Sequence, residues 1–170
     1  MMHTIHLLTV SDRVSAGTAE DTAGAAVRAL LAEALPDWPL HRQVVPDGDA
    51  PVSAAVAAAC VGGARVVLTL GGTGVGPRDR TPEAVAPLIT RQLPGIPELL
   101  RSAGREQTPA AVLSRGVAGV VDPPLPDGHR PVVVVTLPGS RRAAEQAVPL
   151  LAPLLPHLVD QLDGGDHARP

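Results

Sequence analysis

The chain has 170 residues, of which 45% are apolar, and a formal net charge of −3 at pH 7. Trp38 is its only Phe, Tyr or Trp residue, so the core has to be built from Ala, Val, Leu and Ile, which suits layered strands and helices. The acidic balance and the lack of aromatic stacking platforms argue against a nucleic-acid partner, and no apolar stretch is long enough to cross a membrane. Cys60 is the only cysteine, which excludes an intrachain disulfide, and we expect a cytoplasmic protein.

The first half of the chain alternates strand patterns with helix patterns. In chain order we expect a strand over 3–10, a loop over 11–17, a helix from Asp21 to about Leu35, a strand over 38–45, a helix from Asp49 to Gly62 and a strand over 65–70. Asp21 and Asp49 are suited to cap their helices. The third strand is apolar almost throughout, which is typical of a central parallel strand covered on both faces.

The stretch from Gly71 to Arg80, which we call the glycine loop, holds four glycines, two arginines and one aspartate. Glycine amides can approach a phosphate closely, arginines donate charged hydrogen bonds to it, and Asp79 can hold a magnesium ion. The loop is not a P-loop, because the chain has no lysine, and its G-x-G-x-G spacing differs from the dinucleotide fingerprint. A tight turn that needs glycine for positive φ is the alternative explanation of the glycines alone. The charged residues favour phosphate binding.

The second half continues the alternation of strands and helices. We expect a helix capped by Thr81 that breaks at 94–97, a helix over 97–105, an unassigned segment over 110–116, a short strand over 117–121, an exposed turn over 122–128, a strand over 131–137 and a final helix capped by Ser140. Three prolines inside the final helix predict that it is kinked or segmented. We expect one domain over 1–163 and a disordered tail over 164–170.

Polar and charged residues follow four of the expected strands, where an α/β fold with a mostly parallel sheet gathers its ligand-binding loops. They are Ser11-Asp12-Arg13, Pro46-Asp47, the glycine loop and Pro138-Gly139-Ser140. Arginines beside aspartates indicate a site for a metal and a polyphosphate. Taken singly, Asp12 also fits a loop cap and Asp47 a turn residue. Cys60 lies in an apolar helix pattern and is assigned to the core.

Seven short motifs follow one another along the chain: Ser11-Asp12-Arg13, Pro46-Asp47, Leu70-Gly71-Gly72-Thr73-Gly74, Pro77-Arg78-Asp79, Thr81-Pro82-Glu83-Ala84, Leu113-Ser114-Arg115 and Leu137-Pro138-Gly139-Ser140. In this order they resemble the molybdenum cofactor biosynthesis family that includes molybdopterin adenylyltransferase. The resemblance runs from about His6 to Leu158. It implies an αβα sandwich with a mostly parallel sheet and a homotrimer. It also implies a magnesium-dependent transfer of AMP from ATP to the terminal phosphate of molybdopterin.

The resemblance also assigns roles to individual residues. It implies Asp47 and Asp79 as the catalytic and magnesium-binding residues. It implies a substrate-binding set of Ser11, Asp12, Arg13, Gly71, Gly72, Thr73, Gly74, Arg78, Ser114, Pro138, Gly139 and Ser140. The substrates would be molybdopterin and ATP, and the molybdenum-insertion protein is a candidate partner. Arg80 departs from the family, because a small apolar residue is expected there.

Two other functions are compatible with the same motifs. One is a pterin-binding or carrier protein without catalysis, which would keep the glycine loop but would not need both Asp47 and Asp79. The other is a nucleotide-processing domain related to the competence-damage proteins, which usually carry additional domains. The presence of both aspartates favours the adenylyltransferase.

Overall fold

Residues 3–124 and 130–165 are described by the computed structural model, and within them one sheet holds six strands. The strands are β1 (Thr4–Val10), β2 (Leu40–Val45), β3 (Ala64–Leu70), β4 (Arg91–Gln92), β5 (Ala118–Val121) and β6 (Val132–Leu137). Their order is β2-β1-β3-β6-β5-β4, and the first four in this order are parallel. β5 runs antiparallel to both β6 and β4, so the predicted mostly parallel sheet is confirmed.

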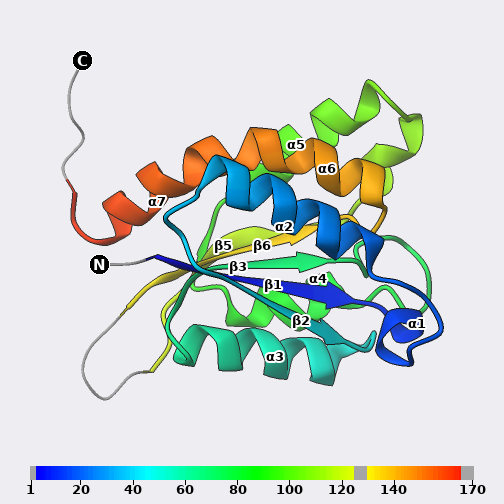
Figure 1. Cartoon of the computed structure of the whole chain (residues 1–170), viewed down its shortest axis with the longest axis horizontal. Helices are drawn as coiled ribbons and strands as arrows, with labels where there is room; N and C mark the ends of the chain where they lie inside the picture. Colours follow the sequence, from blue (N-terminus) through cyan, green and yellow to red (C-terminus); the bar gives the residue numbers. More distant parts are fainter. Residues whose placement is uncertain (1–2, 125–129, 166–170) are drawn as a thin grey trace.

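Helices lie in two layers, one on each face of this sheet (Figure 1). One face is covered by α2 (Thr22–Ala34), α5 (Gly95–Arg105), α6 (Arg141–Leu151) and α7 (Leu155–Leu162), the other by α3 (Asp49–Val61) and α4 (Thr81–Val85). The shorter helices are α1 (Asp12–Ser15) and the 3₁₀ segments η1 (Ala86–Leu88), η2 (Pro109–Leu113) and η3 (Ala152–Leu154). The predicted αβα sandwich is confirmed.

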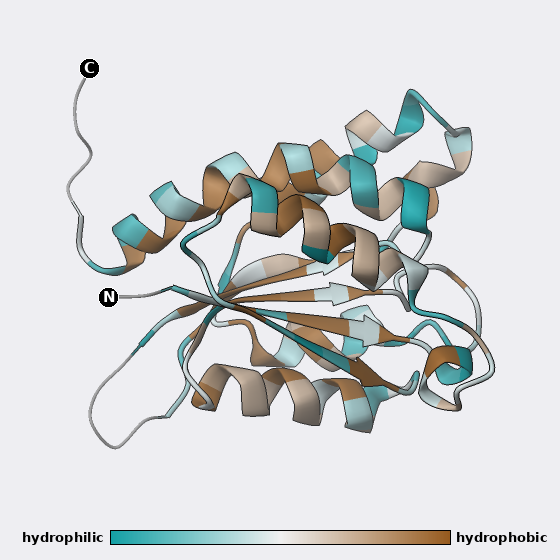
Figure 2. Ribbon diagram, viewed as in Figure 1, coloured by the Kyte–Doolittle hydropathy of each residue, from teal (hydrophilic) through white to brown (hydrophobic). Residues whose placement is uncertain are grey.

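The two central strands, β3 and β6, are buried along their whole length. Val66 lies beside Val133 and Leu68 beside Val135, so branched side chains stack across the sheet. Figure 2 shows the apolar colouring along the strands and on α2 and α6, which pack on them. Cys60 lies on the buried side of α3, in the core as predicted, and burial raises the pKa of its thiol to about 11. The core therefore needs no aromatic side chain.

The last helical stretch is divided into three segments, as its prolines predict. Pro149 lies inside α6, Pro153 lies in η3 and Pro156 in the first turn of α7. Each proline lacks the backbone N–H that a continuous helix would need, and the 3₁₀ segment forms between the two α-helical ones. The segments still bury one face, with Leu151 and Leu155 fully inside the core.

One predicted loop and two predicted helix caps are wrong. The expected loop over 11–17 contains α1, whose N-cap Ser11 accepts a hydrogen bond from Val14 N at 3.3 Å. Asp49 is the first residue of α3 and not its cap; the N-cap is Gly48, which makes no side-chain hydrogen bond. Thr81 is likewise the first residue of α4, with Arg80 at the N-cap position. The predicted caps Asp21 and Ser140 are confirmed.

The segment between β3 and β5 differs from the prediction in its helix lengths. The helix that begins at Thr81 ends after the 3₁₀ turn at Leu88, and the two-residue strand β4 follows it. The next helix, α5, begins at Gly95 and not at Pro97. The segment left unassigned forms η2. The predicted strand over 117–121 corresponds to β5.

Two side-chain contacts lie at the amino ends of the strands, and each of them includes a residue near one end of the chain. The rings of His3 and Trp38 lie with centroids 4.9 Å apart, and Trp38 packs against the core beneath α2. The buried side chain of Arg65, at the start of β3, donates to Asp163 Oδ1 at 2.5 Å and so ties the end of α7 to the sheet.

Across residues 3–124 and 130–165, no helix combines the length and the hydropathy that a membrane crossing requires. The turn expected over 122–128 and the tail expected over 164–170 fall partly outside the described residues, at 125–129 and 166–170. Gly164 and Gly165, which are described, donate hydrogen bonds to the carbonyls of Gln161 and Asp160 at the end of α7.

Candidate functional site

The loops that follow β1, β2, β3 and β6 meet at the carboxyl edge of the sheet, the usual position for ligands in parallel α/β folds. A cavity of about 600 Å³ opens there. Nine of the predicted site residues line it: Ser11, Asp12, Arg13, Asp47, Gly71, Gly72, Asp79, Gly139 and Ser140. Residues that are up to about 130 positions apart in the sequence are thus brought to one cavity, as the parallel topology predicts.

Asp12 and Asp47 are linked by two reciprocal hydrogen bonds, in which each carboxylate accepts the backbone N–H of the other residue. Asp12 N donates to Asp47 Oδ2 at 2.8 Å, and Asp47 N donates to Asp12 Oδ1 at 3.0 Å. Arg78 joins them from the glycine loop: its Nε and Nη2 donate to Asp12 Oδ2 at 3.1 and 2.7 Å, and Nη2 also donates to Asp47 O at 3.1 Å. The Arg78 side chain is 66% exposed, so this ion pair adds little stability. Its main effect is to join the loops that follow β1, β2 and β3.

Two glycines begin the glycine loop in conformations that other residues rarely adopt. Gly71 has a φ of 111° and Gly72 a φ of 65°. A Cβ on Gly71 would lie 2.4 Å from Val10 O, and one on Gly72 would lie 2.2 Å from Thr81 Oγ1. Thr81 N donates to Gly72 O at 3.0 Å and closes the loop at its far end. The tight-turn explanation therefore accounts for these two glycines.

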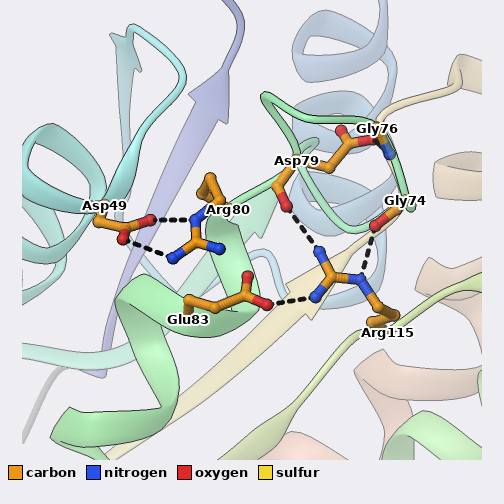
Figure 3. Close-up of polar contacts among 7 residues, drawn as sticks. All are labelled: Asp49, Gly74, Gly76, Asp79, Arg80, Glu83 and Arg115. Atoms are coloured by element: carbon orange, nitrogen blue, oxygen red, sulfur yellow. Dashed lines mark hydrogen bonds and ion pairs between the residues drawn. The ribbon is translucent and has the colours of Figure 1, made fainter.

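Asp79 is held in place by its own loop. Its Oδ2 accepts from Gly76 N at 2.8 Å, and its backbone N donates to Gly76 O at 3.1 Å (Figure 3). Its Oδ1 accepts no hydrogen bond from any described residue, and the residue lines the larger cavity. The carboxylate is thus oriented by the protein and keeps one oxygen for a ligand.

A second cavity, of about 380 Å³, lies between the glycine loop, η2, α5 and α6. The predicted residues Thr73, Gly74, Ser114 and Pro138 line it, and Gly139 and Ser140 line both cavities. Its wall is mostly aliphatic, with Arg101 and Arg142 as its charged members. Of the predicted site residues, Arg78 alone lines neither cavity.

Two carboxylates suit a magnesium ion that is shared with a substrate. Asp47 and Asp79 both line the larger cavity, and on each of them Oδ1 accepts no hydrogen bond from the described residues. Within the described part of the chain, no three His, Cys, Asp or Glu side chains are grouped closely enough to hold a metal by themselves. Mg²⁺ commonly takes one or two carboxylates and completes its shell with substrate phosphates and water. The donor set therefore fits magnesium on a phosphate substrate.

Residues 6–157 match the model of a protein family described as "Probable molybdopterin binding domain". The chain belongs to this family. The matched span contains all the residues that line the two cavities, and the resemblance inferred from the seven motifs is confirmed.

Relatives with similar sequence and structure come from several bacteria. The molybdenum cofactor biosynthesis bifunctional protein of Synechococcus elongatus is 41% identical over 161 residues, which are 95% of this chain and 48% of that protein. The chain thus spans about half the length of this relative. The molybdopterin adenylyltransferase of Helicobacter pylori is 34% identical over 96% of this chain and 90% of its own. A crystal structure of a molybdopterin biosynthesis protein from Mycobacterium abscessus has a TM-score of 0.84 and 37% identity, covering 95% of this chain and 97% of that one.

Arg115 is a residue of this molybdopterin-binding-type domain to which the sequence assigned no role. It follows Ser114 in a motif, but no local pattern indicates its partners, which are 32 to 41 positions away. They all belong to the glycine loop or to α4, which starts where that loop ends. The signal for Arg115 is therefore visible only in the three-dimensional structure.

Arg80, at a position where the resemblance implies a small apolar residue, pairs with Asp49. Its Nε and Nη2 each donate to the Asp49 carboxylate at 2.9 Å (Figure 3). These hydrogen bonds lower the pKa of Asp49. The pair ties the end of the glycine loop to the start of α3.

Proposed function

We propose that this chain is a molybdopterin adenylyltransferase, which transfers AMP from ATP to the terminal phosphate of molybdopterin and releases pyrophosphate. The observation that carries the proposal is the placement of Asp47 and Asp79 on a cavity that adjoins a second one at Gly139 and Ser140. Two adjoining cavities suit two substrates that must react with each other. The name of the Helicobacter pylori relative supports the same activity, because that match extends over most of both chains.

The larger cavity suits the triphosphate of ATP and the smaller one suits molybdopterin. Asp47 and Asp79 would hold magnesium, which neutralises charge on the phosphates when it is bound. The amides of the glycine loop and those at the N-terminus of α6, which Ser140 caps, offer donors to anionic groups at the junction of the cavities. The pterin would lie along the glycine loop and the Ser140 turn.

The reaction needs little proton chemistry from the protein. An oxygen of the molybdopterin phosphate attacks the α-phosphorus of ATP, a new P–O bond forms, and the bond from that phosphorus to the β-phosphate bridging oxygen breaks. Pyrophosphate leaves with the bonding electron pair. Because the attacking group is already an anion, no strong general base is required, and the protein contributes alignment and charge compensation.

The decisive experiment incubates the purified chain with ATP, molybdopterin and magnesium and measures adenylated molybdopterin and pyrophosphate. We expect the two products in equal amounts. In Asp47→Asn, the amide oxygen can still accept from Asp12 N, but the negative charge is lost. We expect its turnover number to fall by about 10²-fold or more with molybdopterin binding retained. Asp37→Asn, on the exposed turn after α2, is the matched control and should keep full activity.

Other outcomes would identify the alternatives. Molybdopterin binding without any adenylate would establish the carrier function and contradict the proposal. Release of pyrophosphate without adenylated molybdopterin would favour a nucleotide-processing enzyme. Full turnover in Asp47→Asn would return Asp47 to a purely structural role beside Asp12.

The proposal includes the setting in which the reaction takes place. We propose a homotrimer in the cytoplasm that hands its adenylated product to a molybdenum-insertion protein, because these properties accompany the family resemblance. Retention of the product by the chain and its consumption by such a partner can be measured with the adenylated compound made in the assay above.

A further inference from the structure

Arg115, between η2 and β5, uses all three guanidinium nitrogens on one loop and the helix that follows it (Figure 3). Nε donates to Gly74 O at 2.7 Å, and Nη2 donates to Asp79 O at 2.6 Å. Nη1 donates to the Glu83 carboxylate in α4. The backbone of the same residue adds a fourth contact, from Arg115 N to Thr73 O at 2.8 Å. A single residue therefore contacts the first half of the glycine loop at Thr73 and Gly74, its end at Asp79, and the following helix at Glu83.

These contacts link the walls of both cavities. Thr73 and Gly74 line the smaller cavity, whereas Asp79 lines the larger one. Arg115 itself lines neither cavity. Its side chain thus connects two cavity-lining parts of the loop although it lines neither cavity itself.

The pair with Glu83 keeps this arrangement charged and fixed to α4. The hydrogen bond from Arg115 lowers the pKa of Glu83, so the carboxylate is ionised at neutral pH. The two side chains are 36% and 33% exposed, and an ion pair so accessible to water contributes little to overall stability. The main consequence of the contacts is local geometry.

We propose that Arg115 is a positioning residue for adenylyl transfer: it places Asp79 relative to the Thr73–Gly74 wall of the neighbouring cavity. The inference rests on the proposed function. A lysine cannot replace the guanidinium, because one ammonium cannot direct donors to three acceptors in a planar fork. Asp79 is thereby held at its carboxylate by Gly76 N and at its carbonyl by Arg115, in addition to its own N–H bond to Gly76 O.

The test compares Arg115→Ala and Arg115→Lys with the parent and with Arg91→Ala. Arg91 also pairs with an acidic residue, Asp122, but lies on β4 away from both cavities. Turnover is measured well below the unfolding temperature of every variant, so that a residue that only stabilises the fold would leave it unchanged. We expect kcat to fall about 10²-fold in Arg115→Ala and about tenfold in Arg115→Lys, with KM for both substrates within about twofold. Arg91→Ala should match the parent.

Two further measurements test the position of Asp79 and the order of the glycine loop. The magnesium concentration for half-maximal rate should rise several-fold in Arg115→Ala and not in Arg91→Ala. Hydrogen exchange at the Gly76, Asp79 and Thr81 amides, which are bonded within the loop, should accelerate about tenfold or more in Arg115→Ala. Arg115→Lys keeps the positive charge. If Arg115→Ala does not fold, the same measurements are made on Arg115→Lys.

The outcomes separate this inference from the proposed function. A parent chain that forms no adenylate contradicts the proposed function, and loop exchange then decides the role of Arg115. Unchanged exchange in the folded variants contradicts the positioning role whether or not the parent is active. In an active parent, an unchanged kcat in both variants also overturns it, as does a loss confined to KM.

Discussion

At the scale of single residues, Asp47 and Asp79 share one arrangement. Each uses Oδ2 to accept a backbone N–H, from Asp12 in one case and from Gly76 in the other. Each keeps Oδ1 without a donor among the residues that the structure describes. Both carboxylates are therefore oriented before any ligand arrives, and binding requires little reorganisation of the protein.

Asp79→Asn separates the charge of this residue from its place in the loop. The amide retains an oxygen that can accept from Gly76 N, so we expect the melting temperature to change by only a few degrees. Magnesium-dependent turnover should fall by about 10²-fold or more, because an amide oxygen is a weaker ligand than a carboxylate. The checks are thermal unfolding and the adenylation rate over a magnesium titration, with Asp37→Asn as the control. A near-parental rate at ordinary magnesium concentration would show that Asp79 holds no metal.

Single residues were predictable from the sequence where their role is attached to a motif. Asp47, Asp79 and Ser140 were singled out because they follow strands, and the structure brings them to adjoining cavities. The contribution of Asp47 to local structure was missed, because its contact with Asp12 crosses 35 positions of sequence. Arg115 was missed for the same reason.

At the scale of elements, the start of the glycine loop includes a close contact between Gly72 and Thr81. Gly72 has a φ of 65° and faces Thr81 Oγ1, whereas Gly17 has nearly the same φ, 71°, with nothing within 4 Å of its Cβ position. The two glycines thus share nearly the same φ but differ in their surroundings. They allow the conformational requirement to be measured apart from the steric one.

We expect Gly17→Ala to lower the free energy of unfolding by about 1 kcal/mol, the cost of the left-handed conformation alone. Gly72→Ala should lower it by about 2–4 kcal/mol, because the overlap with Thr81 adds an overpacking cost. Urea unfolding of the two variants and the parent measures both values. Equal losses in the two variants would mean that Thr81 moves aside freely and that the contact does not determine the loop.

The elements themselves were predictable where many residues act together. The valine runs of β3 and β6 and the proline-divided end of the chain have patterns several residues long. Helix starts depend on one residue. At the start of α3 the N-cap is Gly48, and the side chain of Asp49, the first helical residue, binds Arg80 in a different part of the chain. β4, with only two residues, is too short to have a pattern. Its position results from backbone pairing with β5 at the edge of the sheet and not from a pattern in its own sequence.

At the scale of the whole molecule, the assembly is a prediction from family resemblance. We expect sedimentation equilibrium to give a mass about three times the 17.4 kDa of one chain at micromolar concentration. The mass should stay constant on dilution through that range, because an obligate assembly buries a large apolar interface. A mass of one or two chains would contradict the homotrimer and leave the two-cavity proposal for the single chain unaffected.

The packing of Trp38 against His3 at the amino edge has a consequence for how the molecule can be observed. With a single tryptophan and no tyrosine or phenylalanine, the intrinsic fluorescence of the protein originates at this one position. The indole lies at the amino end of the strands, whereas both cavities lie at the carboxyl end, so its emission reports the packing of Trp38 against the core. Unfolding can thus be followed optically in the presence of a proposed nucleotide substrate, provided that excitation is placed at wavelengths longer than the nucleotide's absorption band. A second tryptophan introduced at the exposed Val75 would add one distinguishable signal from the glycine loop itself.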